Sequence, residues 1–273
     1  MTKKQTMLKT IFNTIFVNTF NEVETQTSNN PQLDKKVITI LLVVSFSLIF
    51  IQYFGNFQFL ISTLKTIKLN GLANGLNSLQ SNFPNARLFQ LTYWVGILIT
   101  FYFIIPVFII KAFFKDKLSD YGLSPKGFFK NYKTYIVFFL FMVPLILLVS
   151  TTESFQHKYP FYNPKGESLF PNFVIWQCLY LTQFFALEFF FRGFMIHGIK
   201  KRFGFYSIFI MMIPYVMIHF QKPMPETIGA VFAGIILGAL SLKSRSIWLG
   251  IAIHYSVAIT MDLAALWQKG YFD

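Results

Sequence analysis

The sequence predicts an all-α protein built as a bundle of transmembrane helices. Of its 273 residues, 54% are hydrophobic and only 13% are charged, and the mean hydropathy is +0.51. A soluble globular domain typically carries about a quarter charged residues. Several apolar runs also approach the roughly 20 residues that a helix needs to cross the hydrocarbon of a bilayer. Composition and run length together indicate a polytopic membrane protein.

About seven segments are expected to span the membrane, and the fifth and sixth of them are short. Pro223 and Pro225 lie between these two, so the chain should turn there because proline interrupts a helix. Residues 55–87, which are rich in Asn, Ser and Gly, should form a loop with a short interfacial helix. The expected spans cover residues 37–54, 88–110, 134–150, 171–199, 206–220, 226–242 and 247–267.

The chain divides into three expected parts. Residues 1–36 should form a cytoplasmic amphipathic helix and a linker, because apolar residues recur every three to four positions up to Phe20. A partly disordered tail is the alternative for this part. Residues 37–170 hold the first three spans with their loops, and residues 171–267 hold a core of four spans.

The excess of basic residues is explained by membrane topology. The formal net charge is +13, and the segments expected on the N-terminal side of the membrane hold more than twice as many lysines and arginines as the others. By the positive-inside rule, we expect the N-terminus in the cytoplasm and the C-terminus outside. The sequence therefore predicts an integral plasma (inner) membrane protein whose partner is the lipid bilayer, with no nucleic-acid partner.

Two further features limit the possible chemistry. Cys178 is the only cysteine, so an internal disulfide is excluded. Residues 1–36 contain no continuous apolar core followed by small residues, so we expect no cleavable signal peptide.

Two charged residues, Glu188 and Arg192, interrupt the apolar run of the fourth span. Positions i and i+4 lie on one face of a helix, so the two side chains can pair. Ionised side chains are costly inside the membrane, and they commonly face the bundle interior and mark functional sites. A purely structural pair that joins two helices is the alternative.

Other polar groups in the later spans are expected to share that interior. His219 ends the fifth span, Glu226 opens the sixth, and His254 lies within the seventh, eight residues before Asp262. At about 1.5 Å per residue, Glu188, His219 and His254 differ in depth by roughly 9 Å, which helix tilt can accommodate. The alternatives are interfacial roles for His219 and Asp262, and for Glu226 the role of an acid in the first turn of a helix, favoured by the helix dipole or by Lys222. The sequence thus predicts one cavity near mid-membrane.

The sequence from residue 171 to 267 resembles the CPBP family, the CAAX-protease and bacteriocin-processing (Abi) intramembrane proteases. The family carries three motifs, EExxxR, FxxxH and HxxxN. Glu188 matches the second glutamate, Arg192 the arginine, and His219 and His254 the two histidines. Tyr215 stands where the second motif usually has phenylalanine.

The resemblance implies an intramembrane endopeptidase in which a glutamate activates water and histidines bind or polarise the peptide. This chain departs from the motifs at two positions: Leu187 replaces the first glutamate and Ala258 replaces the asparagine. If the chain is a hydrolase, Glu188 or Glu226 would take the place of the missing acid. The predicted catalytic residues are therefore Glu188, Arg192, His219, His254 and Glu226, and the predicted substrate is a membrane or lipid-associated peptide or protein.

Three alternatives stay open from the sequence. Two histidines and one carboxylate form a known catalytic zinc set, so a metalloprotease would use Glu188, His219 and His254 as ligands, although no HExxH pairing is present. A non-catalytic member of the fold would bind a protein and act in immunity or regulation. A small transporter that uses buried ionisable groups as a proton relay is the third, and no internal repeat supports it.

Overall fold

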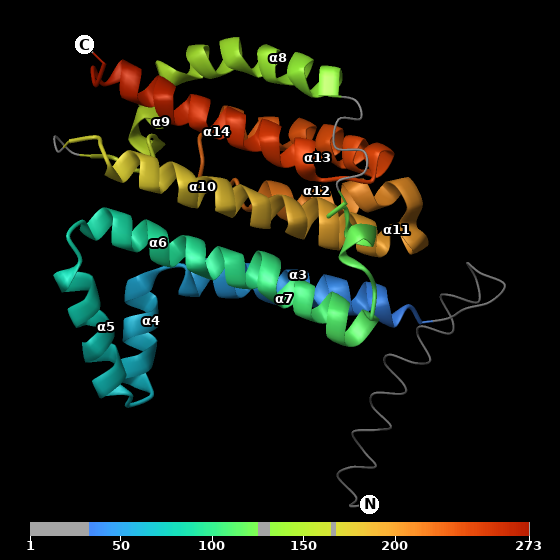
Figure 1. Ribbon diagram of the computed structural model, residues 1–273, viewed down its shortest axis with the longest axis horizontal. Helices are drawn as coiled ribbons and strands as arrows, with labels where there is room; N and C mark the ends of the chain where they lie inside the picture. Colours follow the sequence, from blue (N-terminus) through green and yellow to red (C-terminus); the bar gives the residue numbers. More distant parts are fainter. Residues whose placement is uncertain (1–32, 125–131, 165–167, 273) are drawn as a thin grey trace, which may run out of the picture.

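The computed structural model describes residues 33–124, 132–164 and 168–272, and within them the protein contains helices and no strand. The predicted amphipathic helix near the N-terminus lies outside these residues. The long helices run side by side as a bundle (Figure 1). The prediction of an all-α polytopic bundle is therefore confirmed.

The first half of the chain supplies three long helical segments and a short hairpin. The second segment is not uniformly α-helical, because it widens into π-helical turns at Thr100–Ile104 and Ile109–Phe114. The helices are α3 (Lys35–Phe54), α4 (Phe57–Thr66), α5 (Asn70–Asn82), α6 (Ala86–Ile99), α7 (Ile105–Phe108), α8 (Tyr132–Ser150) and α9 (Glu153–Lys158).

The second half of the chain supplies the centre of the bundle. A π-helical segment, Phe189–His197, joins two of its α-helices, and π-helical turns are frequent at functional sites. The helices are α10 (Asn172–Glu188), α11 (Gly198–Phe203), α12 (Ser207–Met217), α13 (Met224–Ser244) and α14 (Trp248–Gln268).

Six described segments are long and apolar enough to cross a membrane, one fewer than the expected seven. The difference arises in Asn172–Met217, a 46-residue run that contains most of both the fourth and the fifth expected spans. At Gly204, whose φ is +54°, the chain turns, and α12 packs back against the π-helical segment. With 11 residues, α12 is about 16 Å long, roughly half the thickness of the hydrocarbon.

The short α12 still returns the chain across part of the bundle, so the helix directions alternate as expected. In Figure 1 the start of α3 lies at one end of the bundle and the C-terminus at the other. This arrangement agrees with the start of α3 and the end of α14 on opposite sides of the membrane. Which side is cytoplasmic stays a prediction from the basic residues.

The region between the first two long segments is a helical hairpin, where one short helix was expected. Helices α4 and α5 project from one end of the bundle (Figure 1). The Asn56 side chain caps α4 by accepting a hydrogen bond from the Gln58 amide at 2.9 Å. Phe57, Ile61 and Ala73 are buried in one apolar cluster, against which Phe89 and Tyr93 of α6 also pack.

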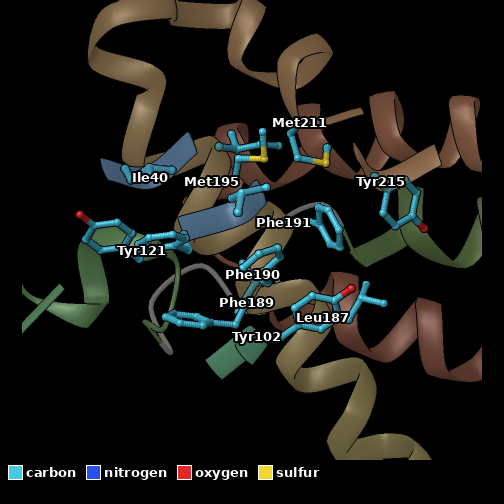
Figure 2. Packing of buried hydrophobic residues seen from close by; sticks show 14 of the residues in the cluster. Ile40, Tyr102, Tyr121, Leu187, Phe189, Phe190, Phe191, Met195, Met211 and Tyr215 are labelled. Carbon is cyan, nitrogen blue, oxygen red and sulfur yellow. The ribbon is translucent and has the colours of Figure 1, made fainter. Parts of the chain in front are cut away.

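Aromatic packing places the π-helical segment at the centre of the bundle. Phe189, Phe190 and Phe191 follow one another in the chain and are all fully buried. Figure 2 shows these rings with Tyr102 and Tyr215 around them, and the Tyr102 and Phe190 ring centroids are 4.5 Å apart. The two charged residues beside these rings are therefore held inside the protein and away from lipid.

Candidate active site

Glu188 is the last residue of α10, and its side chain is fully buried. Its Oε1 atom lies 3.0 Å from Nη1 of Arg192 and 2.8 Å from Nδ1 of His254. Helix α14 approaches the carboxylate closely at Gly250, where an added Cβ would lie 2.9 Å from Oε2. The predicted pair thus exists, and His254 joins it from a third helical element.

Arg192 is also fully buried, and its guanidinium lies over the ring of Tyr215, 4.1 Å from the ring centroid. Its contact with Glu188 is close enough for an ion pair but is not aligned as a hydrogen bond. The three guanidinium nitrogens and Glu188 Oε2 have no hydrogen-bond partner among the described residues. Unsatisfied buried polar atoms are rare and are often retained where chemistry takes place.

His254 connects the buried ion pair to a cavity. An ionised carboxylate can only accept hydrogen bonds, so Nδ1–H of His254 donates to Glu188. This tautomer leaves Nε2 unprotonated on the opposite edge of the ring, 3.5 Å from the Tyr215 hydroxyl. The side chain keeps 15% of its surface exposed, whereas Glu188 keeps none.

His219 follows the end of α12 and is held by the backbone. Its Nδ1 donates to the carbonyl oxygen of Tyr215 at 2.8 Å, which again leaves Nε2 as an acceptor. Tyr215 therefore contacts three site residues: its ring lies under Arg192, its hydroxyl is near His254 and its carbonyl holds His219. The sequence offered one signal for Tyr215, its position one helical turn before His219.

A cavity of about 970 Å³ lies between the helices, and His219, His254 and Leu187 all line it. Glu188 and Arg192 lie behind its wall. Leu187, the residue at the position of the family's first glutamate, therefore faces the space in which that glutamate would act. No aspartate or glutamate is among the described residues that line the cavity, which include Leu48, Gln52, Asn56, Arg87, Trp94, Leu98, Tyr102, Tyr180, Gln183 and Lys222.

Glu226, the other predicted acid, belongs to a separate cluster. Its carboxylate accepts from Nζ of Lys222 at 2.6 Å and from the Tyr159 hydroxyl at 2.8 Å. Burial and the nearby Glu226 raise the pKa of Tyr159 well above its usual value of 10, so its hydroxyl stays protonated and donates. The structure thus gives Glu226 a role in holding Tyr159 and does not bring it to Glu188.

Asp262 anchors the loop formed by residues 159–162. It is fully buried, which differs from the interfacial position that the sequence also allows. Its Oδ1 accepts from the backbone amide of Phe161, and its Oδ2 accepts from the Trp176 ring and the Gln177 amide, each at 3.0 Å. Arg87 donates to the Phe161 carbonyl from the opposite side. Because Phe161 lines the cavity, Asp262 positions part of the cavity wall.

Replacing Asp262 with asparagine should lower the free energy of unfolding by about 1–3 kcal/mol, because an amide nitrogen would face donors that now bind a carboxylate. Thermal unfolding of purified protein in nanodiscs measures this. Asp120→Asn, at an exposed position, is the matched control and should change stability by less than about 0.5 kcal/mol. Equal effects of the two substitutions would contradict the anchoring role.

The predicted zinc ligands do not form a ligand set. Among the residues that the structure describes, no group of three or more His, Cys, Asp or Glu side chains is arranged to hold a metal ion. Glu188 Oε1 faces the Arg192 guanidinium, and Nδ1 of each histidine is used in a hydrogen bond. A cation at Glu188 would also lie against the positive charge of Arg192, so the donors do not fit a metal ion.

A comparison with models of protein families matches residues 169–260 to the model described as type II CAAX prenyl endopeptidase Rce1-like. The match includes Glu188, Arg192, His219 and His254, which confirms the resemblance noted in the sequence. No curated protein and no solved structure matches the chain.

Proposed function

We propose that this chain, whose residues 169–260 match the model of type II CAAX prenyl endopeptidases, is an intramembrane endopeptidase of the CPBP/CAAX protease family. It would hydrolyse peptide bonds in membrane-associated substrates, with water activated by a site that depends on Glu188. The observation that carries this proposal is the cavity: two histidines line it, and one of them is hydrogen-bonded to a buried carboxylate.

The chemistry of peptide hydrolysis requires the groups that the site brings together. A water molecule must lose a proton as it attacks the carbonyl carbon, and a positioned acid–base pair typically contributes about 10²- to 10⁴-fold to such a step. Glu188 supplies a buried negative charge next to His254. Donors that line the cavity, such as the Gln183 amide one helical turn before Leu187, are available to the carbonyl oxygen.

The lining of the cavity supports a membrane or lipid-associated peptide as substrate. Apolar and aromatic side chains from α3, α6 and α10 form much of the wall, while Arg87 and Lys222 are the cationic residues among its described lining. Such a surface accepts an apolar group together with a neutral or anionic peptide end. We further propose that the protein lies in the plasma (inner) membrane with a cytoplasmic N-terminus, on the basis of its lysine and arginine distribution.

Hydrolysis of quenched fluorogenic peptides tests the proposal. The purified full chain in lipid nanodiscs is incubated with peptides that carry an apolar anchor, and the fragments are identified by mass spectrometry. We expect cleavage by the parent protein and a loss of at least about 100-fold in Glu188→Gln. Glu153→Gln makes the same change at an exposed position and is the matched control.

Two further outcomes are decisive. Glu226→Gln should still cleave, since its carboxylate binds Lys222 and Tyr159; a loss as large as that of Glu188→Gln would make Glu226 the essential acid. If the parent cleaves no peptide of the set, hydrolysis is contradicted and binding without catalysis, in immunity or regulation, becomes the function to test.

A further inference from the structure

We propose that His254 is the general base of this site and that Glu188 is a positioning residue acting through it. The inference rests on the proposed function, because it names the group that takes the proton from water. It also changes the sequence-based hypothesis, in which a glutamate takes the proton directly.

The first argument is accessibility. Glu188 is fully buried, and its Oε1 contacts both Arg192 and His254 while its Oε2 is packed against Gly250. The cavity wall therefore separates water in the cavity from this carboxylate. Since the described lining contains no acid and Leu187 has no proton acceptor, the base that touches water must be another group.

The second argument separates the two histidines of the cavity. Both use Nδ1–H as a donor, so Nε2 of each ring is unprotonated and can accept a proton; Nε2 of His254 also lies 3.5 Å from the Tyr215 hydroxyl. The partner of His254 is a carboxylate, whereas the partner of His219 is a neutral backbone carbonyl. A carboxylate stabilises the imidazolium formed by proton uptake more than a carbonyl does, because a charge-assisted hydrogen bond is about twice as strong as a neutral one. Arg192 contacts the same carboxylate oxygen and offsets part of this effect.

The third argument is the local geometry of the pair. Nδ1 of His254 is 2.8 Å from Glu188, which fixes both the tautomer and the orientation of the ring. Phe184 packs against the same ring with centroids 4.5 Å apart. The ring is thus held so that its second nitrogen lies on the edge away from Glu188, and its partly exposed side chain lines the cavity.

The step balances with water as the only co-reactant. Nε2 of His254 takes one proton from water as the oxygen forms a bond to the carbonyl carbon of the substrate. The bond between that carbon and the amide nitrogen then breaks, and the proton on Nε2 passes to the leaving nitrogen. The products are a carboxylic acid, which ionises, and an amine, and His254 returns to its starting form.

Chemical rescue tests the base directly in the full chain. His254→Ala should lose at least about 100-fold in kcat, and added imidazole should restore part of that rate by entering the space left in the cavity. A series of methylimidazoles should restore rates that increase with their basicity, as expected for proton transfer. His219→Ala is the matched control, and imidazole should not restore it in this way.

Two variants distinguish loss of the basic nitrogen from misfolding of the protein. His254→Asn keeps a donor for Glu188 but has no basic nitrogen, so it should fold with the parent's thermal stability and lose kcat while KM stays within about threefold. Adding Leu187→Glu to His254→Asn places a carboxylate on the cavity wall, and it should restore cleavage by at least about tenfold.

A double variant tests the role of Glu188. If Glu188 acts only through His254, Glu188→Gln combined with His254→Asn should be no slower than the slower single variant, because coupled residues are strongly non-additive. Multiplicative losses, or a His254→Asn variant with the parent's kcat, would overturn the assignment of the base while leaving the hydrolase function intact. Absence of cleavage in the parent would overturn both.

Discussion

Replacing Arg192 with methionine should lower the free energy of unfolding by about 3–5 kcal/mol. The Glu188 carboxylate would then remain fully buried without its cationic neighbour, 3.0 Å away in the parent. Breaking a buried pair costs this much because one charge is left uncompensated, whereas removing both charges is often nearly neutral. Denaturant or thermal unfolding in nanodiscs measures the change.

A double-variant cycle and a second ion pair serve as controls for this prediction. Glu188→Gln together with Arg192→Met should be more stable than Arg192→Met alone, because no buried charge remains. The pair Lys222–Glu226 has the same i,i+4 spacing but side chains that are 20% and 16% exposed. Lys222→Met should therefore cost less than Arg192→Met, and equal costs would show that burial of the Glu188 pair does not matter.

Gly250→Ala should reduce peptide cleavage by about 100-fold while the protein remains folded. The added methyl group would lie 2.9 Å from Glu188 Oε2, so the carboxylate must shift and its hydrogen bond to His254 must change. Displacements of about 1 Å in a catalytic arrangement commonly cost this much. The rate of hydrolysis, measured beside the thermal unfolding temperature, separates the two effects.

Gly229→Ala is the control for this substitution. Gly229 also lies inside a long helix, α13, and an added Cβ would have no atom within 4 Å. Alanine has the higher helix propensity, so this variant should cleave like the parent and be at least as stable. A loss of activity in both variants would indicate that glycine itself, and not the space beside Glu188, is required.

The sequence was sufficient to predict the fold class and the pairing within the fourth span. Hydropathy alone marks the apolar helices, and the spacing of Glu188 and Arg192 places both charges on one helical face. The approach of His254 followed from similar depths of the residues in their spans. These features depend on the spacing of residues along the chain and on the hydropathy that a membrane requires, and both can be read from a single sequence.

The orientation of the acid relative to the cavity was not predictable in the same way. Leu187 and Glu188 are neighbours in the chain, and a rotation of one residue, about 100° in an α-helix, decides which of them faces the cavity. That rotation depends on the close approach of α14 at Gly250 and on the π-helical turns that follow Glu188. Both are set by packing between distant segments.

The remaining differences have similar causes. The length of α12 was overestimated because Ile218, His219 and Phe220 are compatible with a helix by composition, yet the chain leaves the helix after Met217. The partners of Asp262 are not predictable from the sequence, since the donors on Phe161 and Trp176 lie 101 and 86 positions away along the chain. Such contacts leave no periodic signal in the sequence.

The burial of Glu188 and Arg192 also constrains how the protein is made. The helix that contains them, α10 with its π-helical extension, is enclosed by neighbours that are synthesised later, including α12 and α14. During insertion, two charges would face lipid until these helices arrive, and such a helix enters the bilayer poorly on its own. Helix α14, the last to leave the ribosome, therefore completes both the site and the burial of the Glu188–Arg192 ion pair. A chain shortened before Trp248 should be removed by quality control and not persist as a stable membrane protein.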